Sequence, residues 1–264
     1  MKCKICKSKS DEVFTSKILS RHDIAYFLCR NCGFLQTEEP YWLEESYQES
    51  VNISDTGYMS RNIYLSRVSS VLIYLFFNRK ARFIDYGGGY GVFVRLMRDI
   101  GFNFYWQDTY TTNLFARGFE AETPPYELVT SFETFEHFVE PDKEIRIMLE
   151  LGDNILFSTE LYGDTVPLPN EWHYYGFTHG QHISFYNIKT LQYIAQKYSL
   201  RLWSNGSSLH LLTKQKINSN LLKLAYYSSK VGFADIVKRL MNSKTLSDCN
   251  YLRNYDKKDS SKSS

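Results

Sequence analysis

The stretch from Phe83 to Gly91, which reads Phe-Ile-Asp-Tyr-Gly-Gly-Gly-Tyr-Gly, constrains the fold of this chain most strongly. An apolar strand runs into Asp85, and Gly87, Gly89 and Gly91 occupy three alternate positions before an amphipathic segment begins at Val92. Glycine lacks the Cβ atom that would hold a ligand off the backbone, and it adopts backbone angles closed to other residues. The stretch therefore predicts a strand-to-helix turn that approaches a ligand closely. Val92 stands where the dinucleotide fingerprint has a third glycine or an alanine, which argues against a nicotinamide dinucleotide.

Strand-like and helix-like segments alternate along most of the chain. Apolar runs predict strands over 82–85, 102–107, 126–132, 154–159, 200–204 and 208–214. Helical periodicity predicts helices over 59–77, 90–100, 142–151, 187–198 and within 217–241. Repeated strand-helix units favour a mainly parallel sheet with helices on both faces. Asn205-Gly206 predicts a hairpin, which adds an antiparallel C-terminal strand.

Four of the five cysteines form two Cys-x-x-Cys pairs, Cys3 with Cys6 and Cys29 with Cys32. Each pair forms a tight knuckle, and two knuckles complete a tetrahedral zinc site. Four thiolates leave no open coordination position, so the predicted Zn²⁺ is structural. A redox pair and an unmetallated hairpin are the alternatives.

Charge and hydropathy limit the partners and the location of the chain. The 31 basic and 29 acidic residues give a net charge of only +2, so nucleic acid is not the expected partner. The longest apolar run, Val68 to Phe77, is far shorter than the roughly 20 residues of a membrane span. The N-terminus has no apolar signal region. We therefore expect a cytoplasmic protein without a transmembrane segment.

Three groups of residues together resemble the motifs of class I S-adenosylmethionine-dependent methyltransferases. They are Asp85-x-Gly87-x-Gly89-x-Gly91, the acidic Asp108 after the second strand, and Ser131 to His137 after the next long strand. The match covers about residues 82–160. With the cysteine pairs in front and Gly180 to Tyr186 behind, the chain to about residue 214 resembles bacterial methyltransferases that carry an N-terminal zinc module.

The resemblance implies a Rossmann-like, mainly parallel sheet of seven strands behind a small zinc ribbon, with S-adenosyl-L-methionine as cofactor. It also implies a link to surface-glycan or modified-sugar biosynthesis. In this pattern Asp85 orders the turn and the methionyl amine, and Phe132 and Glu133 lie near the sulfonium. Asp108 is positioned to accept both ribose hydroxyls, with a solvated loop aspartate as the alternative.

Methylation of a sugar hydroxyl needs a base that removes its proton, and histidine suits that task. His182 is our first candidate because it follows a long loop over 160–181 that leaves a strand end. His137 is the second, and its neighbour Glu136 is placed to orient either imidazole. Each histidine also has a structural alternative. His182 would form a hydrogen bond that holds the loop to the helix after it, and His137 would be a residue at the start of a helix.

Aromatic and basic residues around this region are candidates for substrate binding. Trp172, Tyr174 and Tyr175 either stack on a sugar face or pack under the loop. Tyr58 and Arg61 precede the glycine turn, where they would close over the cofactor or bind an acidic group such as a sugar-nucleotide phosphate.

The expected regions are a zinc ribbon (1–39), a helical connector and cofactor lid (40–80), the methyltransferase core (81–214), a helical extension (215–255) and a disordered tail (256–264). Helices within 217–241 are basic and amphipathic, so they either pack on their own domain or contact a membrane surface or partner.

The leading function is O-methylation of a sugar hydroxyl, where the sugar is either part of a nucleotide-linked small molecule or part of a glycan. Peripheral contact with glycan assembly machinery is expected to accompany it. Alternatives are C-methylation of a keto-sugar, an RNA-directed protein that uses the zinc ribbon, and a scaffold that binds the cofactor without catalysis.

Overall fold

The computed structural model describes residues 1–47 and 55–260, with side chains through residue 254. The chain forms two compact units, each built from two separate segments. The first unit comprises Met1–Asp55 and Val129–Lys216, and the second comprises Thr56–Leu128 and Ile217–Ser264. The boundary after Leu128 therefore falls inside the region 81–214 that the sequence suggests is one core. Part of the predicted connector, residues 48–54, lies outside the described residues.

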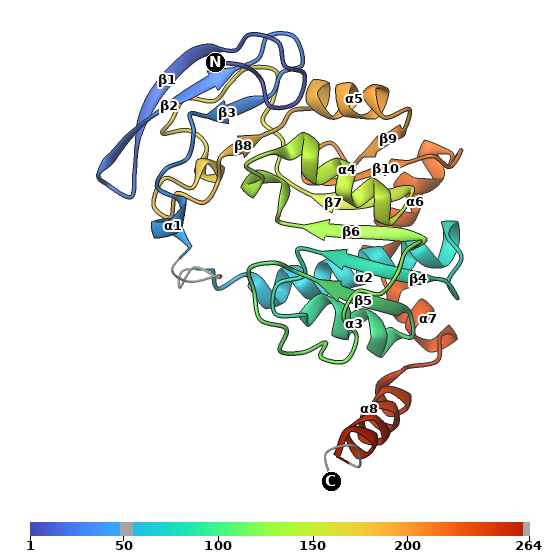
Figure 1. Ribbon diagram of the computed structural model, residues 1–264. Coiled ribbons are helices and arrows are strands. Elements are labelled where there is room, and N and C mark those ends of the chain that lie inside the picture. Colours follow the sequence, from blue (N-terminus) through green and yellow to red (C-terminus); the bar gives the residue numbers. More distant parts are fainter. Residues whose placement is uncertain (48–54, 261–264) are drawn as a thin grey trace. The chain divides into compact units, whose positions relative to one another are not determined.

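The first unit contains most of the strands (Figure 1). Its strands are β1 (Asp11–Ile18), β2 (His22–Leu28), β3 (Leu35–Thr37), β6 (Leu128–Phe132, whose first residue belongs to the second unit), β7 (Asn154–Ser158), β8 (Ser184–Phe185), β9 (Arg201–Ser204) and β10 (Leu209–Thr213). Its α-helices are α1 (Leu43–Ser46), α4 (Pro141–Leu151) and α5 (Ile188–Lys197). Two 3-10 turns, Phe135–His137 and His173–Tyr175, follow β6 and β7 along the chain.

The N-terminal sheet has four antiparallel strands in the order β1-β2-β3-β8. Strand β8 comes from far along the chain, and its Phe185 pairs with Leu35 of β3. A buried hydrophobic cluster that includes Tyr26, Tyr175 and Phe185 joins the two segments. The cysteine-bearing region is thus part of a larger unit, which the sequence did not predict.

The larger sheet has the strand order β5-β4-β6-β7-β10-β9. β4 pairs in parallel with β5, and β6 with β7, whereas β10 is antiparallel to both β7 and β9. This confirms a Rossmann-like α/β arrangement with an antiparallel C-terminal strand, and among the described residues the sheet has six strands where seven were expected. Glu120 makes only an isolated parallel bridge to Trp106. Pro124 and Pro125 follow closely, and proline cannot donate the N–H that a strand needs.

The second unit supplies β4 (Arg82–Tyr86) and β5 (Asn103–Gln107), with helices α2 (Tyr58–Phe76), α3 (Val92–Ile100), α6 (Ser219–Lys230), α7 (Phe233–Leu240) and α8 (Thr245–Ser260). α3 begins after Gly91 and ends at Gly101, both with positive φ, and it buries Phe93 and Met97. α8 continues to Ser260, so the predicted disorder from residue 256 is wrong up to that point, and residues 261–264 lie outside the described residues. Among the described helices, none combines the length and hydropathy needed to cross a membrane.

Candidate functional site

The glycine turn joins the ends of β4 and β5 within the second unit. The backbone N–H groups of Gly87 and Gly88 donate to the carbonyl oxygen of Gln107, at 2.8 and 3.1 Å. The indole N–H of Trp106 donates to the carbonyl oxygen of Gly89 at 2.8 Å. The turn is therefore held by its own backbone groups at the carboxyl ends of two parallel strands, where ligands bind in folds of this kind.

Two of the glycines are required by geometry. Gly91 has φ +84°, and a Cβ atom there would lie 2.8 Å from Oδ1 of Asn113. Gly89 has φ +52°, and a Cβ atom there would lie 3.0 Å from the hydroxyl of Tyr58. Side chains rarely adopt this backbone region, so both positions favour glycine before any ligand is considered.

Asp108 lies beside the turn, as the sequence predicted, and holds it in place. Its Oδ2 accepts the backbone N–H of Gly89 at 2.9 Å. Its Oδ1 accepts the N–H groups of Tyr110 and Thr111, each at 2.8 Å. A carboxylate has about four lone-pair positions, so these three contacts leave Asp108 about one position for a ligand, rather than the two that accepting both ribose hydroxyls would need.

Tyr58, at the start of α2, faces the same turn. Burial raises the pKa of its phenol; an N–H from Tyr90 opposes this rise, and the nearby carboxylates of Asp85 and Asp108 add to it. Asp85 itself is buried at the end of β4. Arg61 follows Tyr58 on α2 and is half-buried. The predicted residues Tyr58, Asp85 and Asp108 are thus brought together in the second unit.

The first unit gathers the three predicted catalytic residues. Glu136 and His137 lie in the 3-10 turn after β6, and His182 lies just before β8. The N–H of Ile183 donates to the carbonyl oxygen of Glu136 at 2.9 Å, which joins the two segments. One ligand atom from each of Glu136, His137 and His182 lies within 4.8 Å of the other two. This spacing suits either a shared proton or a metal ion.

Backbone carbonyl groups fix the tautomers of both histidines. Nδ1 of His182 lies 2.6 Å from the carbonyl oxygen of Tyr174, and Nδ1 of His137 lies 3.1 Å from that of Gln181. A carbonyl oxygen only accepts, so we assign the proton to Nδ1 and the lone pair to Nε2 in each ring. The hydroxyl of Tyr47 lies 2.9 Å from Nδ1 of His137 and supports its orientation.

Burial keeps both imidazoles neutral. It lowers the pKa of His137 to about 4. Burial and the neighbouring His137 lower the pKa of His182 well below its ordinary value. At neutral pH both rings therefore have a lone pair available.

Glu136 is completely buried, and burial together with the charge of Glu133 raises its pKa to about 8. Among the described residues, neither of its carboxyl oxygens has a hydrogen-bond partner of good geometry. The hydroxyls of Thr159 and Tyr174 lie nearby, lower this pKa and contact one another at 3.3 Å. Glu136 is therefore placed to exchange a proton with the polar side chains next to it, which include His137 and His182.

Phe132 and Glu133, predicted near the sulfonium, lie at and just after the end of β6. Glu133 has φ +53°, and its carboxylate accepts the hydroxyl of Ser158 at 2.6 Å. The N–H of Glu133 donates to the same hydroxyl oxygen at 2.8 Å. Ser158 ends β7, so these contacts fix the residue where two parallel strands end.

The three aromatic candidates differ in exposure. Tyr175 is completely buried, and its hydroxyl donates to the carbonyl oxygen of Pro167 at 2.7 Å, so its ring has no exposed face for a sugar. Tyr174 is almost as buried and orients His182 through its carbonyl group. Trp172 is partly buried and donates to Glu160 at 2.7 Å. The sequence missed the roles of Tyr47 and of the Tyr174 carbonyl, because no motif marks them.

The four cysteines of the N-terminal pairs come together as predicted. Their sulfur atoms all lie within 4.8 Å of one another, with Cys3 3.6 Å from Cys32 and Cys6 3.3 Å from Cys29. Zinc-sulfur bonds of about 2.3 Å in a tetrahedron place the sulfurs about 3.8 Å apart, so the arrangement fits one Zn²⁺ ion. None of the four forms a disulfide bond.

Comparison with known proteins addresses the family. Residues 60–205, more than half of the chain, match the model of a methyltransferase domain. No curated protein sequence matches the chain.

Similar solved structures include the magnesium protoporphyrin IX methyltransferase of Synechocystis with bound SAH, at 12% identity and a TM-score of 0.44, covering 65% of this chain and 93% of that one. They also include human N-acetylserotonin methyltransferase in complex with SAM, at 13% identity and a TM-score of 0.39, covering 66% of each chain. These likenesses are too distant to bear on the substrate. The family match, which spans the glycine turn and the histidine cluster, shows that the chain belongs to the methyltransferase-domain family.

Proposed function

We propose that the protein transfers a methyl group from S-adenosyl-L-methionine to a hydroxyl group of a sugar, either nucleotide-linked or within a glycan. The observation that carries the proposal is the glycine turn with Asp108 bonded to it, in a chain of the methyltransferase-domain family. The acceptor class rests on the resemblance of the motifs to sugar methyltransferases, and the location that we propose is the cytoplasm.

The second unit supplies the residues that we propose for the cofactor. S-adenosylmethionine has no phosphate group, so the turn needs close backbone approach rather than an anion cradle. Gly87, Gly89 and Gly91 provide that approach, and the remaining lone pair of Asp108 accepts from the ribose. Tyr58 and Arg61 are proposed to cover the bound molecule. Asp85 is a further proposed contact in this unit, whereas Phe132 and Glu133, which are proposed near the sulfonium, belong to the first unit.

The first unit supplies the acid-base residues of the proposal. When bound, the cofactor would supply an activated methyl group for the acceptor oxygen, with its sulfur as the leaving group. His182 is proposed to take the hydroxyl proton at Nε2, because its Nδ1 already donates to Tyr174. His137 is the second candidate for the base, and Glu136 adjoins both imidazoles and is proposed to orient one of them. Trp172 remains a proposed sugar contact. The Cys3, Cys6, Cys29 and Cys32 site is proposed to hold structural zinc.

A methyl-transfer assay with labelled S-adenosylmethionine and a panel of nucleotide-linked sugars tests this function. Wild-type protein should label an acceptor, and His182→Ala should lower turnover by about 10²–10⁴-fold. His173→Ala is the matched control, since that side chain is 85% exposed and lies outside the cluster. Full turnover by His182→Ala would refute the proposed base. A product methylated on carbon would identify the keto-sugar reaction instead, in which the same histidine removes a proton next to a carbonyl group.

A further inference from the structure

The α6–α7 region carries a local excess of positive charge. Residues 217–244 contain five basic residues and one acidic residue, although the whole chain is nearly neutral. Four of the basic side chains are exposed, those of Lys223, Lys230, Lys238 and Arg239. The acidic residue, Asp235, is already paired with Arg67 through two contacts of 2.8 Å.

The same two helices expose large apolar side chains. On α6, Leu222, Ala225 and Tyr226 are buried, whereas the opposite side of the helix is open to solvent. Six apolar side chains there and on α7 are between 48% and 83% exposed: Leu221, Leu224, Tyr227, Val231, Ile236 and Leu240. Those of α6 recur three or four residues apart, which places them on one side of a helix. An exposed apolar group of this kind with charges around it marks an interaction surface.

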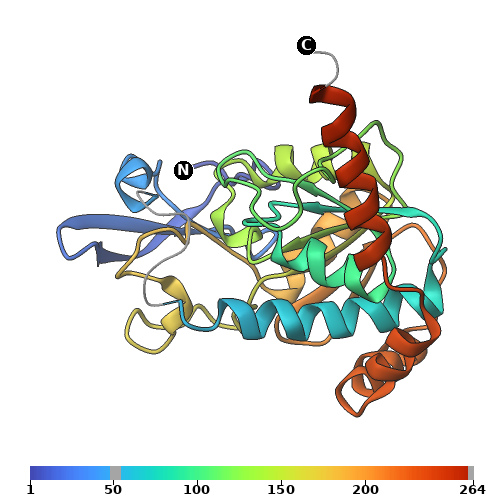
Figure 2. The same cartoon turned by 90° about the horizontal axis from the view of Figure 1, so that it is seen from below.

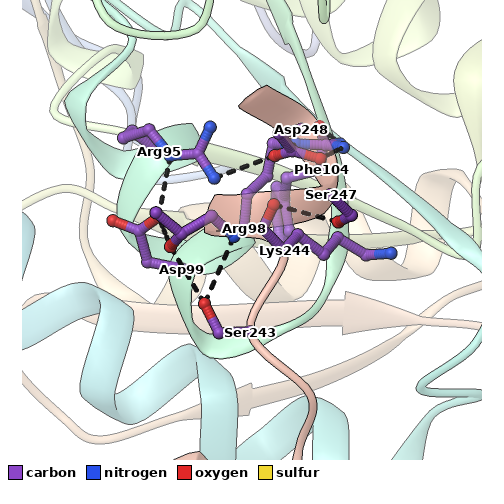
Figure 3. A network of polar contacts seen from close by, with 9 residues as sticks. Arg95, Arg98, Asp99, Phe104, Ser243, Lys244, Ser247 and Asp248 are labelled. Atoms are coloured by element: carbon purple, nitrogen blue, oxygen red, sulfur yellow. Dashed lines mark hydrogen bonds and ion pairs between the residues drawn. The ribbon is translucent and has the colours of Figure 1, made fainter. Parts of the chain in front are cut away.

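Helices α6 and α7 are packed against other helices of their own unit, so their exposed face has a fixed position on that unit. Figure 2 shows α6 and α7, in orange-red, beside α2, in cyan, and both helices contact α2. Tyr64 of α2 donates its hydroxyl to that of Tyr226 at 3.0 Å. Beyond α7, Asp248 accepts from Arg95 and Arg98 of α3, which anchors the chain again (Figure 3).

We propose that the α6–α7 face binds an anionic lipid surface. Surface-binding helices insert apolar side chains at the boundary of headgroups and acyl chains, while Lys and Arg pair with anionic lipids, and this face has both features. A second copy of the chain is disfavoured, because it would bring two cationic faces together. The inference goes beyond the proposed function and does not depend on it.

Co-sedimentation of the full chain with vesicles tests the proposal. The protein should bind vesicles of phosphatidylcholine mixed with phosphatidylglycerol, bind phosphatidylcholine alone much less, and dissociate at high salt. Lys238→Gln with Arg239→Gln should weaken binding at least tenfold, at about fivefold per charge removed. Leu224→Ser with Val231→Ser should weaken it as well.

Two controls keep the test specific. Lys80→Gln removes an exposed charge elsewhere in the second unit, and Leu246→Ser removes an exposed apolar side chain from α8. Both should bind vesicles like wild type, and every variant should keep the wild-type melting temperature. Absence of binding to anionic vesicles would overturn the proposal. Binding of both double variants to anionic vesicles as tightly as wild type would also overturn it. So would a wild-type protein that binds no vesicles but forms a dimer, if Leu224→Ser with Val231→Ser abolishes that dimer.

Discussion

Replacing Asp248 by alanine should strongly destabilise the second unit. Asp248 and Arg98 are each 5% exposed, and they pair through two contacts of 2.7 and 2.8 Å (Figure 3). Removing one partner of a buried ion pair costs about 3–5 kcal/mol, because the other charge stays buried. Arg98 would keep its contact with the carbonyl oxygen of Phe104 and its position 3.6 Å over the ring of Phe119. We therefore expect the low end, about 3 kcal/mol.

Thermal unfolding followed by circular dichroism measures this loss. A change of about 3 kcal/mol corresponds to roughly 6–12 °C in melting temperature for a protein of this size. Arg98→Met combined with Asp248→Ala should recover part of the loss, since no charge is then left unpaired. Asp235→Ala is the control, because its pair with Arg67 is exposed and should matter much less. A melting temperature within 1–2 °C of wild type for Asp248→Ala, a shift worth less than about 1 kcal/mol, would refute the reasoning.

The pair of Asp248 and Arg98 should also make the stability of the fold depend on pH. Burial by itself would raise the pKa of Asp248, but the hydrogen bonds from Arg98 and Arg95 outweigh it and hold that pKa below its usual range. A carboxyl group with a depressed folded-state pKa stabilises the fold above its unfolded pKa, about 3.9. The advantage of wild type over Asp248→Ala should therefore be complete at neutral pH and shrink as the pH falls below about 4. An advantage that grew on acidification would contradict this.

Two further predictions test the sites. Gly91→Ala should weaken binding of S-adenosylhomocysteine, measured by calorimetry, and cost about 1–3 kcal/mol of stability from backbone strain, measured by melting curves. Gly206→Ala is the control, because Gly206 has φ +86° with open space around it, so the substitution should strain the backbone without affecting binding. If Gly91→Ala bound S-adenosylhomocysteine as well as Gly206→Ala does, the glycine turn would not be important for binding. Wild-type protein should contain zinc equimolar with the chain by elemental analysis, and Cys29→Ser should lose it; metal-free wild type that melts like a zinc-loaded sample would contradict a structural zinc.

Local features of the fold were predictable from the sequence. The glycine turn and the two cysteine pairs depend on spacings of a few residues, so the sequence alone indicates them. The hairpin at Asn205 was also predictable, because its side chain accepts three N–H groups of its own loop, at 2.8 to 3.1 Å. Helix α2 was predicted within one residue at each end, since Leu65, Val68, Val71 and Leu72 recur at helical spacing and are buried, although Ile63 and Leu75 of the same pattern are exposed.

Contacts between distant segments were not predictable. The pairing of β8 with β3 and the contact of Tyr47 with His137 join residues far apart in the chain, and hydrophobic periodicity reports burial rather than pairing. The motif resemblance implied seven strands, but the prolines after Glu120 leave only one bridge there. Asp108 was placed correctly, yet its bond to Gly89 depends on the conformation of a turn that the sequence does not specify.

Calorimetric titration with S-adenosylhomocysteine tests the central claim most directly. Wild-type protein should bind the ligand saturably, and Asp108→Ala should lose binding, because the substitution removes both the proposed ribose contact and the bond that holds Gly89. A titration with NAD should show no binding. Unaltered binding of S-adenosylhomocysteine by Asp108→Ala, or no binding by wild type, would contradict the assignment of the cofactor to the glycine turn.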